Sequence, residues 1–462
     1  MKIFRSDSAA AAGARVSRGR LPGLVLGSSA TIVLSFAAQW LILTRLGATR
    51  VTDSYFAALA VPMVMLYVIS DPLNRVALPT LSVQQDARDF WAYAWTTIQL
   101  TLLIFVVVAL LLYASAPGWI PLLVPGFSGE ATRESISLTR LLLAGMIFQS
   151  GGMAARAVWN AKGHFVWPSA AGVIGVFSSL LLLFLMLDKH GIIAAAWAFD
   201  VRFATEAVLL IGTLGSFARP RWKLAAPYLR KSRPLILGAA YFRTDVLVDR
   251  VLTSLAPPGG LSLLYLAQQL LSAVGQVINQ SVVAPTIPFL AKLAHAGEWQ
   301  VFGRTARIAI RNLLIIATLI LLGLFLFGEP ALSLVFAHRS VGSGDVHRLL
   351  LLMLALGGML VADSAAYFAY SSFYAIGDTT TPTVATAIVY SMGIATKIGA
   401  FLLAGVVGLA LGISGYYVTN ALVLLYLLRR TLLPRKAAEP TGSPPLLGTE
   451  GPVPVTTNVE SF

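Results

Sequence analysis

The chain has 462 residues, of which 57% are hydrophobic and only 12% are charged, and its mean hydropathy is +0.78. A soluble protein of this length carries about twice that charged fraction, so the composition excludes a soluble globular protein. The net charge of +14 would suggest a nucleic-acid partner in a soluble protein, but here the basic residues cluster at the ends of apolar runs, and we expect no nucleic acid. The chain has no cysteine, which excludes disulfides, thiol catalysis and cysteine-based metal sites.

Apolar runs of about 20 residues recur along the whole chain, and such runs cross a bilayer as helices. They do not alternate as barrel strands would, so the sequence predicts an all-α, polytopic membrane protein. The first run is too long for the core of a cleaved signal peptide, and we take it as the first span. The twelve expected spans are residues 21–43, 54–70, 91–115, 137–158, 168–187, 191–216, 234–256, 261–290, 309–327, 349–372, 383–404 and 406–428. Pro62 is expected to break the second span, and Pro285 and Pro288 to kink the eighth or end it early.

The basic residues predict the orientation of these spans. They concentrate in the N-terminus, in the segment 217–233, after the eighth span and after the twelfth, which are all on one side of a twelve-span chain. Because cytoplasmic segments carry the excess of Lys and Arg, both termini are expected in the cytoplasm.

A polar segment occurs twice in the chain. A shift of 214 positions lays WNAKGHFVWPSAA (159–171) over FYAIGDTTTPTVA (373–385) and pairs Gly163 with Gly377. The same shift pairs Gly191 with Gly405. Each segment is expected to be a tight corner rather than a binding site, with Asp378 or a threonine capping the next helix.

The repeat predicts two parallel six-helix lobes related by a pseudo-two-fold axis along the membrane normal. The expected parts are a basic cytoplasmic N-terminus (1–20), an N-terminal lobe (21–216), a basic cytoplasmic linker (217–233), a C-terminal lobe (234–430) and a disordered cytoplasmic tail (431–462).

Several segments resemble one transporter family. FYAIGDTTTPT (373–383) resembles the fYA..DT.TPv segment of the MviN/MurJ family of lipid II flippases, within the multidrug/oligosaccharidyl-lipid/polysaccharide exporter superfamily. Five more segments resemble motifs of this family in the same order: VTDSYFAA (51–58), LLVPGFSGEATRESISLTRLL (122–142), AVWNAKGHFVWPS (157–169), DRVLTSLAPPGGLSLLYLAQQL (249–270) and LVFAHRSVGSGDV (334–346). The resemblance implies a multi-pass flippase of the bacterial inner membrane that works by alternating access.

The chain departs from the resembled family at the positions that concern the substrate. Lipid II flippases of this family carry arginines in the first, second and eighth helices that are thought to hold the pyrophosphate. The first span (TIVLSFAAQWLIL) and the matching part of the second (VPMVMLYVIS) contain no arginine, and the eighth has Ala267-Gln268-Gln269 at the family's arginine position. The family also commonly has fourteen helices. The resemblance therefore implies the fold and the transporter class, and leaves the glycan open.

Ionisable residues inside spans are the candidate site residues, because each costs about 3 kcal/mol to insert and is retained for function or for pairing. The sixth span holds Asp200, Arg202 and Glu206, and Arg202 and Glu206 are spaced for a structural ion pair at i,i+4. Asp363 lies in the tenth span and Lys397 in the eleventh. For the sixth-span group, pairing and function carry equal weight.

The seventh span carries charges of both signs. Arg243 and Arg250 are seven residues apart and share one face, from which two guanidiniums can bind a pyrophosphate bidentately. Asp245 and Asp249 share another face, which can hold a coupling cation, orient the arginines or pair with other helices.

Uncharged polar residues add a weaker indication. Gln269, Gln276 and Gln280 fall near one face of the eighth span, and such a stripe suits sugar hydroxyls and interhelical hydrogen bonds equally well. Asp53 matches an aspartate of the resembled family, and its two open roles are the outer mouth of a cavity and a helix cap.

The favoured hypothesis is a flippase for an undecaprenyl-pyrophosphate-linked glycan, either a lipid II-like precursor or an exopolysaccharide repeat unit. The alternatives are an ion-coupled multidrug exporter of the same superfamily and a non-transporting membrane scaffold. No nucleophile–base set, metal motif or phosphate-binding glycine loop indicates an enzyme. We expect no cofactor, and coupling to Na+, H+ or the membrane potential. The expected partners are the lipid-linked glycan, membrane lipids and proteins of polysaccharide or cell-wall synthesis.

Overall fold

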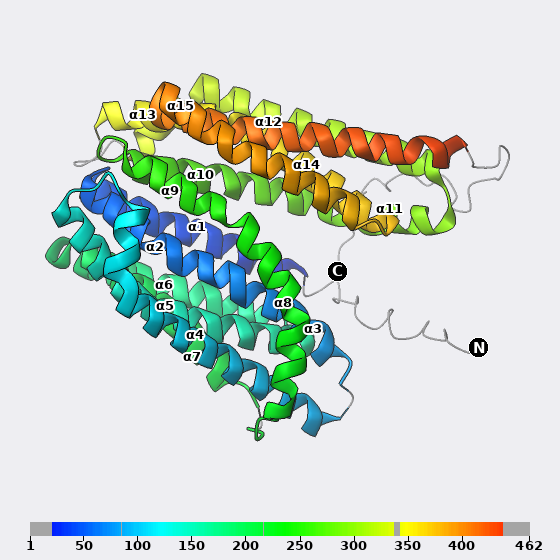
Figure 1. The fold of residues 1–462 in the computed structure, drawn as a ribbon, viewed down its shortest axis with the longest axis horizontal. Helices are drawn as coiled ribbons and strands as arrows, with labels where there is room; N and C mark the ends of the chain where they lie inside the picture. Colours follow the sequence, from blue (N-terminus) through cyan, green and yellow to red (C-terminus); the bar gives the residue numbers. More distant parts are fainter. Residues whose placement is uncertain (1–20, 85, 216, 337–341, 438–462) are drawn as a thin grey trace, which may run out of the picture. The chain divides into compact units, whose positions relative to one another are not determined.

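The computed structural model describes residues 21–84, 86–215, 217–336 and 342–437, and every regular element in these ranges is a helix (Figure 1). The segment 1–20 and residues 438–462 of the tail lie outside the described residues. The helices are α1 (Leu21–Leu46), α2 (Arg50–Met65), η1 (Leu66–Ser70), α3 (Asp71–Ser82), α4 (Ala87–Leu123), α5 (Gly129–Ala161), α6 (Val166–His190), α7 (Ile192–Gly212), η2 (Trp222–Leu224), α8 (Ala225–Phe242), α9 (Thr244–Ser254), α10 (Gly260–Ile278), η3 (Asn279–Val283), α11 (Ala284–Ala296), α12 (Trp299–Phe336), α13 (Ser343–Ala355), α14 (Gly357–Ile376) and α15 (Thr380–Ala437).

Consecutive elements join into helical segments that follow the expected spans. Their number is twelve because α15 counts as two: it divides at Ala404–Gly405, where the backbone leaves the helical conformation. Eight of the described helical stretches are long and apolar enough to cross a membrane by length and composition. The all-α, polytopic prediction is therefore confirmed. Two segments outside those eight, α7 and α8–α9, carry most of the candidate charges.

The prolines act differently from the prediction. The helix runs through Pro62, and the eighth segment continues past Pro285 and Pro288 to Ala296, so the expected break and early end are wrong. A proline cannot donate to the carbonyl four residues earlier and its ring clashes with that carbonyl. The two π-helical turns, η1 and η3, contain the carbonyls four residues before Pro72 and Pro285, and these wider turns accommodate both prolines without ending the helix.

The repeated corners have matching backbone conformations. Gly163 and Gly377 both adopt positive φ, 75° and 86°, which favours glycine. At each corner the glycine amide and the next amide donate 3.0 Å hydrogen bonds to carbonyls at the same relative positions of the preceding helix. Gly191 and Gly405 also share a φ of 57°. The sequence repeat therefore extends to the conformation of its turns.

Asp378 caps the helix that follows the second corner. Its Oδ1 accepts hydrogen bonds from the backbone amides of Thr380 and Thr381, at 3.1 and 3.0 Å. The bonds from Thr381 and the weaker one from Thr380 lower the pKa of Asp378, since they favour its charged form. This corner is thus closed by local hydrogen bonds, as the sequence predicts.

The described helices form two compact units. Unit 1 contains Met1–Ala273, Leu322–Gly357 and Gly393–Ile413, and unit 2 contains Val274–Leu321, Gly358–Met392 and Ser414–Phe462. These contact units do not follow the repeat, and the lobes 21–216 and 234–430 stay a prediction.

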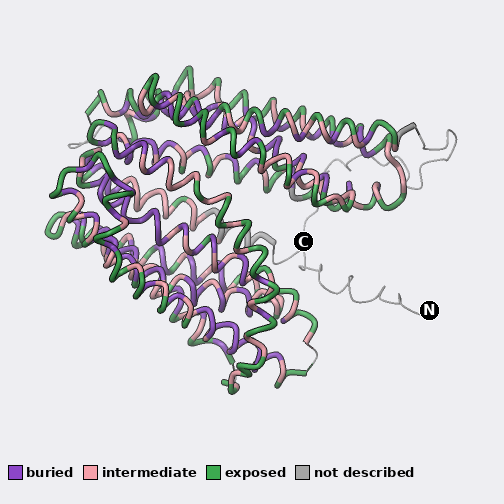
Figure 2. The backbone as a smooth tube through the Cα atoms, in the orientation of Figure 1, coloured by how far each residue is buried: buried purple, intermediate pink, exposed green. Residues whose placement is uncertain are grey.

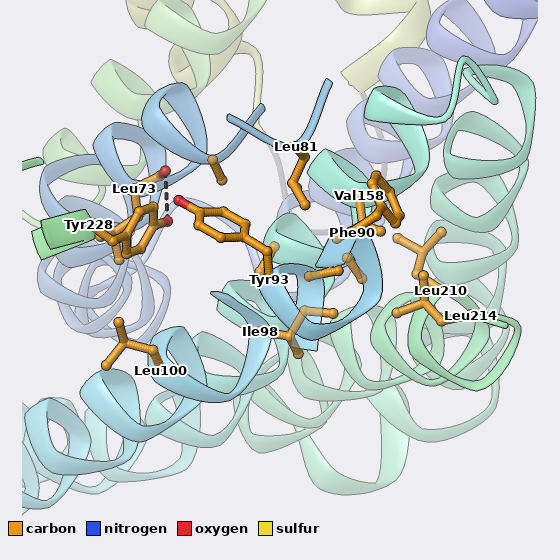
Figure 3. Close-up of a cluster of buried hydrophobic side chains, with 14 of the residues drawn as sticks. Leu73, Leu81, Phe90, Tyr93, Ile98, Leu100, Val158, Leu210, Leu214 and Tyr228 are labelled. Atoms are coloured by element: carbon orange, nitrogen blue, oxygen red, sulfur yellow. Dashed lines mark hydrogen bonds between the residues drawn. The ribbon is translucent and has the colours of Figure 1, made fainter. Parts of the chain in front are cut away.

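Within unit 1, α5 packs against α2, α4 and α7, and α6 packs against α1 and α7 (Figure 1). α2 is buried from Thr52 to Pro62 (Figure 2). A cluster of buried side chains joins α3, α4, α5 and α8, and the Tyr228 hydroxyl closes it with a 2.7 Å hydrogen bond to the Leu73 carbonyl (Figure 3). Leu110 of α4 and Phe184 of α6 remain largely exposed, as lipid-facing side chains do.

Candidate functional site

A cavity of ≈ 280 Å³ lies inside unit 1, enclosed by α1, α2, η1, α5, α6, α7 and α10. Apart from apolar residues, it is lined by Ser35, Gln39, Tyr55, Tyr67, Gln149, Ser179, Arg202, Tyr265 and Gln269. Among these described lining residues, only Arg202 carries a formal charge at neutral pH. The cavity therefore combines amides and phenols with one cation, a composition suited to an anionic, hydroxyl-rich ligand.

Arg202 of α7 faces this cavity without a carboxylate of its own. Its guanidinium carbon lies 5.0 Å from the centre of the Phe203 ring, and its buried Nε has no hydrogen-bond partner among the described residues. Glu206, expected to pair with Arg202, forms its ion pair with Arg156 of α5 instead. Because α5 brings a second arginine to Glu206, Arg202 keeps donors available to a ligand.

Asp200 has a local structural contact. Its Oδ1 accepts a 2.8 Å hydrogen bond from the backbone amide of Gly145 on α5. A Cβ at position 145 would lie 2.5 Å from this oxygen and 2.5 Å from Phe199 Cδ1. Glycine is thus what allows α5 and α7 to approach this closely.

The carboxylate face of α9 is occupied by a lysine. Lys397 Nζ, from α15, lies 3.0 Å from Asp249 Oδ1 and 3.8 Å from Asp245 Oδ2. The Lys397 side chain is only 4% exposed, so the pair is shielded from solvent. This lysine serves both carboxylates, and neither Arg243, which precedes α9, nor Arg250 of α9 forms a salt bridge among the described residues.

Arg243, between α8 and α9, and Arg250 of α9 lie against tyrosine rings instead. The guanidinium carbon of Arg243 is 4.2 Å from the centre of the Tyr67 ring, and that of Arg250 is 4.9 Å from the centre of the Tyr265 ring. Both rings line the cavity. Arg250 is buried, with Nε and Nη1 lacking partners among the described residues, and Gln269 donates a 2.9 Å hydrogen bond to the Tyr265 hydroxyl.

The cavity is thus surrounded by three guanidiniums, those of Arg202, Arg243 and Arg250, each stacked on an aromatic ring that lines it. Stacking holds a guanidinium plane by cation–π attraction and leaves its edge donors available. Such donors match the oxygens of phosphate groups bidentately.

Asp53 and Gln276 fall outside the cavity lining. The buried Asp53 carboxylate accepts hydrogen bonds from the backbone amides of Gly259 and Ser262, at 2.8 and 2.9 Å, and from the Ser262 hydroxyl at 2.7 Å. It therefore caps the start of α10, the second of its two expected roles. Gln276 belongs to unit 2 and is not among the lining residues.

Arg156 and the tyrosines were not among the residues predicted from the sequence. Arg156 lies within the expected fourth span, so the rule that intramembrane charges pair or function would have selected it. No pattern along the chain groups Tyr55, Tyr67 and Tyr265, because they meet only when α2, η1 and α10 pack together.

Residues 42–440 match the sequence profile of a family described as lipid II flippase MurJ. A curated relative, the probable lipid II flippase MurJ of Buchnera aphidicola subsp. Baizongia pistaciae, is 19% identical over 337 residues, which cover 68% of this chain and 64% of that protein. The chain thus spans slightly less than two thirds of this relative.

Two solved structures share the fold. A lipid II flippase MurJ in an inward closed conformation matches with a TM-score of 0.78 and 19% identity over 90% of each chain. An inward-facing multidrug resistance MATE family transporter of the MOP superfamily matches with a TM-score of 0.74 and 16% identity, over 90% of this chain and 100% of that chain. At these identities the likeness concerns the fold alone.

Proposed function

Because the chain belongs to the MurJ family of lipid II flippases, we propose that it moves a pyrophosphate-linked lipid glycan across the bacterial inner membrane by alternating access. The glycan is a lipid II-like precursor or a polysaccharide repeat unit. The observation that carries this proposal is the set of three guanidiniums around one cavity, none of which forms a salt bridge with a carboxylate among the described residues.

The proposed roles follow from the position of each side chain. Arg202 lines the cavity and meets the pyrophosphate first, while Arg243 and Arg250 support it from behind Tyr67 and Tyr265. A charge-assisted hydrogen bond of this kind contributes roughly 1.5–3 kcal/mol. These arginines take the place of the family arginines that are absent from the first, second and eighth spans.

The lining amides and phenols account for the rest of the head group. Gln39, Gln149 and Gln269 offer donors and acceptors to sugar hydroxyls, and the tyrosines offer flat apolar faces with polar edges. The proposal assigns no covalent chemistry to the chain, which acts as a transporter with both termini in the cytoplasm.

Depletion of the protein in its native host tests the proposal. We expect one undecaprenyl-pyrophosphate-linked intermediate to accumulate, and mass spectrometry of the lipid extract identifies its glycan. Re-expression of the wild-type chain should clear it, whereas an Arg202→Gln chain present at the same level should not. Unchanged levels of every lipid-linked intermediate after depletion would exclude the proposed substrate class.

A multidrug exporter is the second candidate, since the chain shares its fold with a MATE family transporter and three tyrosines line the cavity. An exporter of cations should present carboxylates to its ligand, and the described lining residues include none. Binding of a lipophilic cationic dye that pyrophosphate does not displace would favour this candidate over the flippase.

A further inference from the structure

We propose that Asp245 and Asp249 form a monovalent-cation site that the chain fills with its own ammonium group, that of Lys397. The site then takes up no soluble Na+ or K+. What a filled site implies for ion coupling rests on the proposed function, whereas the test below concerns cation binding alone.

The two carboxylates are placed as a pair. Asp245 and Asp249 are four residues apart on α9 and face the same side of the helix. Lys397 Nζ lies 3.0 Å from one and 3.8 Å from the other, and their side chains are 10% and 24% exposed for Asp249 and Asp245. Carboxylate oxygens converging on one point in a dry environment are the ligands that hard cations prefer, and here an ammonium occupies that point.

The backbone of Lys397 is fixed by close helix packing. α15 divides at Ala404–Gly405, and the part after this division returns along the part before it. A Cβ at Gly412 would lie 3.0 Å from Lys397 Cα, and one at Gly408 would overlap the Ala400 carbonyl. Small residues spaced four apart allow this approach within a membrane. The lysine is therefore held in place by both of its neighbouring segments.

The charge balance on α9 disfavours an additional cation. Lys397 of α15 pairs with the two carboxylates, Asp245 and Asp249, and Arg250 of α9 and Arg243, which precedes α9, add further positive charge nearby. A soluble cation would add positive charge where the chain already supplies an excess. Removing the lysine ammonium leaves two adjacent carboxylates with a vacancy between them.

For the proposed transport cycle, this site would take no part in coupling to Na+. The lysine stays attached to α15 and cannot leave the protein, so binding and release of a metal cation at this point cannot drive the cycle.

The test is the thermal stability of the purified chain in chloride salts of Na+, K+ or choline at equal ionic strength. We expect the wild-type Tm to be the same in all three. In choline chloride, Lys397→Ser should have a lower Tm than the wild type. Na+ or K+ should raise the Tm of this variant saturably, by about 2–4 °C. Lys397→Arg keeps a tethered cation and should respond like the wild type. Lys292→Ser, which removes an exposed lysine, is the matched control.

Three results would overturn the proposal. They are a saturable rise of the wild-type Tm with Na+, a folded Lys397→Ser chain without any cation response, and a response that persists in Lys397→Ser/Asp249→Asn. If Lys397→Ser does not fold, the wild type and Lys397→Arg decide the question. A rise of the Tm with Na+ or K+ in either one excludes a filled site. The same Tm in all three salts for both of them supports a filled site. If the Tm values are as expected but the wild-type chain exports no lipid-linked glycan, only the proposed function is contradicted.

Discussion

Asp53 and Ser262 are joined by two hydrogen bonds, in which Asp53 Oδ1 accepts from the Ser262 amide at 2.9 Å and from its hydroxyl at 2.7 Å. Asp53 lies in the segment 51–58 on α2, and Ser262 lies in the first turn of α10, so two segments that resemble the family motifs meet here. An N-cap carboxylate satisfies amides that the helix itself leaves unpaired and complements the positive end of the helix dipole.

Asp53→Ala should therefore destabilise the protein. Loss of a cap costs about 1–2 kcal/mol, and the buried donors left behind add to this. The measurement is the Tm of the purified chain, and Asp53→Asn, which keeps an acceptor oxygen, should lose less. An unchanged Tm together with lost export would instead assign Asp53 to transport.

Gly145→Ala should separate α5 from α7. The added Cβ would meet the Asp200 carboxylate and the Phe199 ring at 2.5 Å, and these neighbours belong to a packed helix pair that cannot yield cheaply. We expect a loss of roughly 1–3 kcal/mol, measured as a lower Tm. Gly118→Ala is the matched control, because nothing lies within 4 Å of a Cβ built there. Equal melting of both variants would contradict the close contact.

The spans and the turns could be predicted from the sequence because both are local. A run of apolar residues defines a span, and Gly163 and Gly377 mark corners whose conformation depends on a few neighbouring residues. Pro285 was misjudged because the π-helical turn η3 can absorb the missing hydrogen bond, and no residue pattern announces that turn, whereas α2 runs through Pro62 without such a turn.

The candidate site could be predicted only in part. Charge within the spans selects Arg202, Arg243 and Arg250, and their role in binding stays a prediction. Which carboxylate each arginine meets depends on neighbouring helices, so the partners of Glu206 and of the α9 aspartates, Arg156 and Lys397, were not predictable from spacing along one helix. The rings of Tyr67 and Tyr265, against which Arg243 and Arg250 lie, are likewise set by tertiary packing.

Cysteine labelling tests the predicted orientation, and the absence of native cysteine makes it simple. Ala226→Cys lies within the basic linker 217–233 and should resist an impermeant thiol reagent in intact cells, because positively charged segments stay in the cytoplasm. Lys189→Cys, at an exposed position on the other predicted side, should react. Labelling of the first position with protection of the second would reverse the topology.

Replacing the three arginines should separate binding from structure. Arg202→Gln should lower export roughly 10- to 100-fold, because it removes a charged contact worth about 1.5–3 kcal/mol, while the amount of folded protein stays unchanged. Arg202→Lys should retain part of the activity, since the charge remains but the planar fork is lost. Arg75→Gln, which removes an exposed arginine paired within its own helix, is the matched control and should transport normally.

Arg250→Gln gives the sharpest contrast with Asp249→Asn. No carboxylate pairs with Arg250 among the described residues, so its removal leaves no buried anion and should not reduce folded protein. Asp249→Asn deprives Lys397 of its 3.0 Å partner and leaves a buried ammonium, which costs up to about 3–5 kcal/mol. We therefore expect lost export with normal abundance for Arg250→Gln and for Arg243→Gln, and lost abundance for Asp249→Asn. If export falls in proportion to the amount of folded protein in all three variants, these charges have a structural role. If export is normal in both arginine variants, Arg202 is left as the sole anion contact of the proposed site.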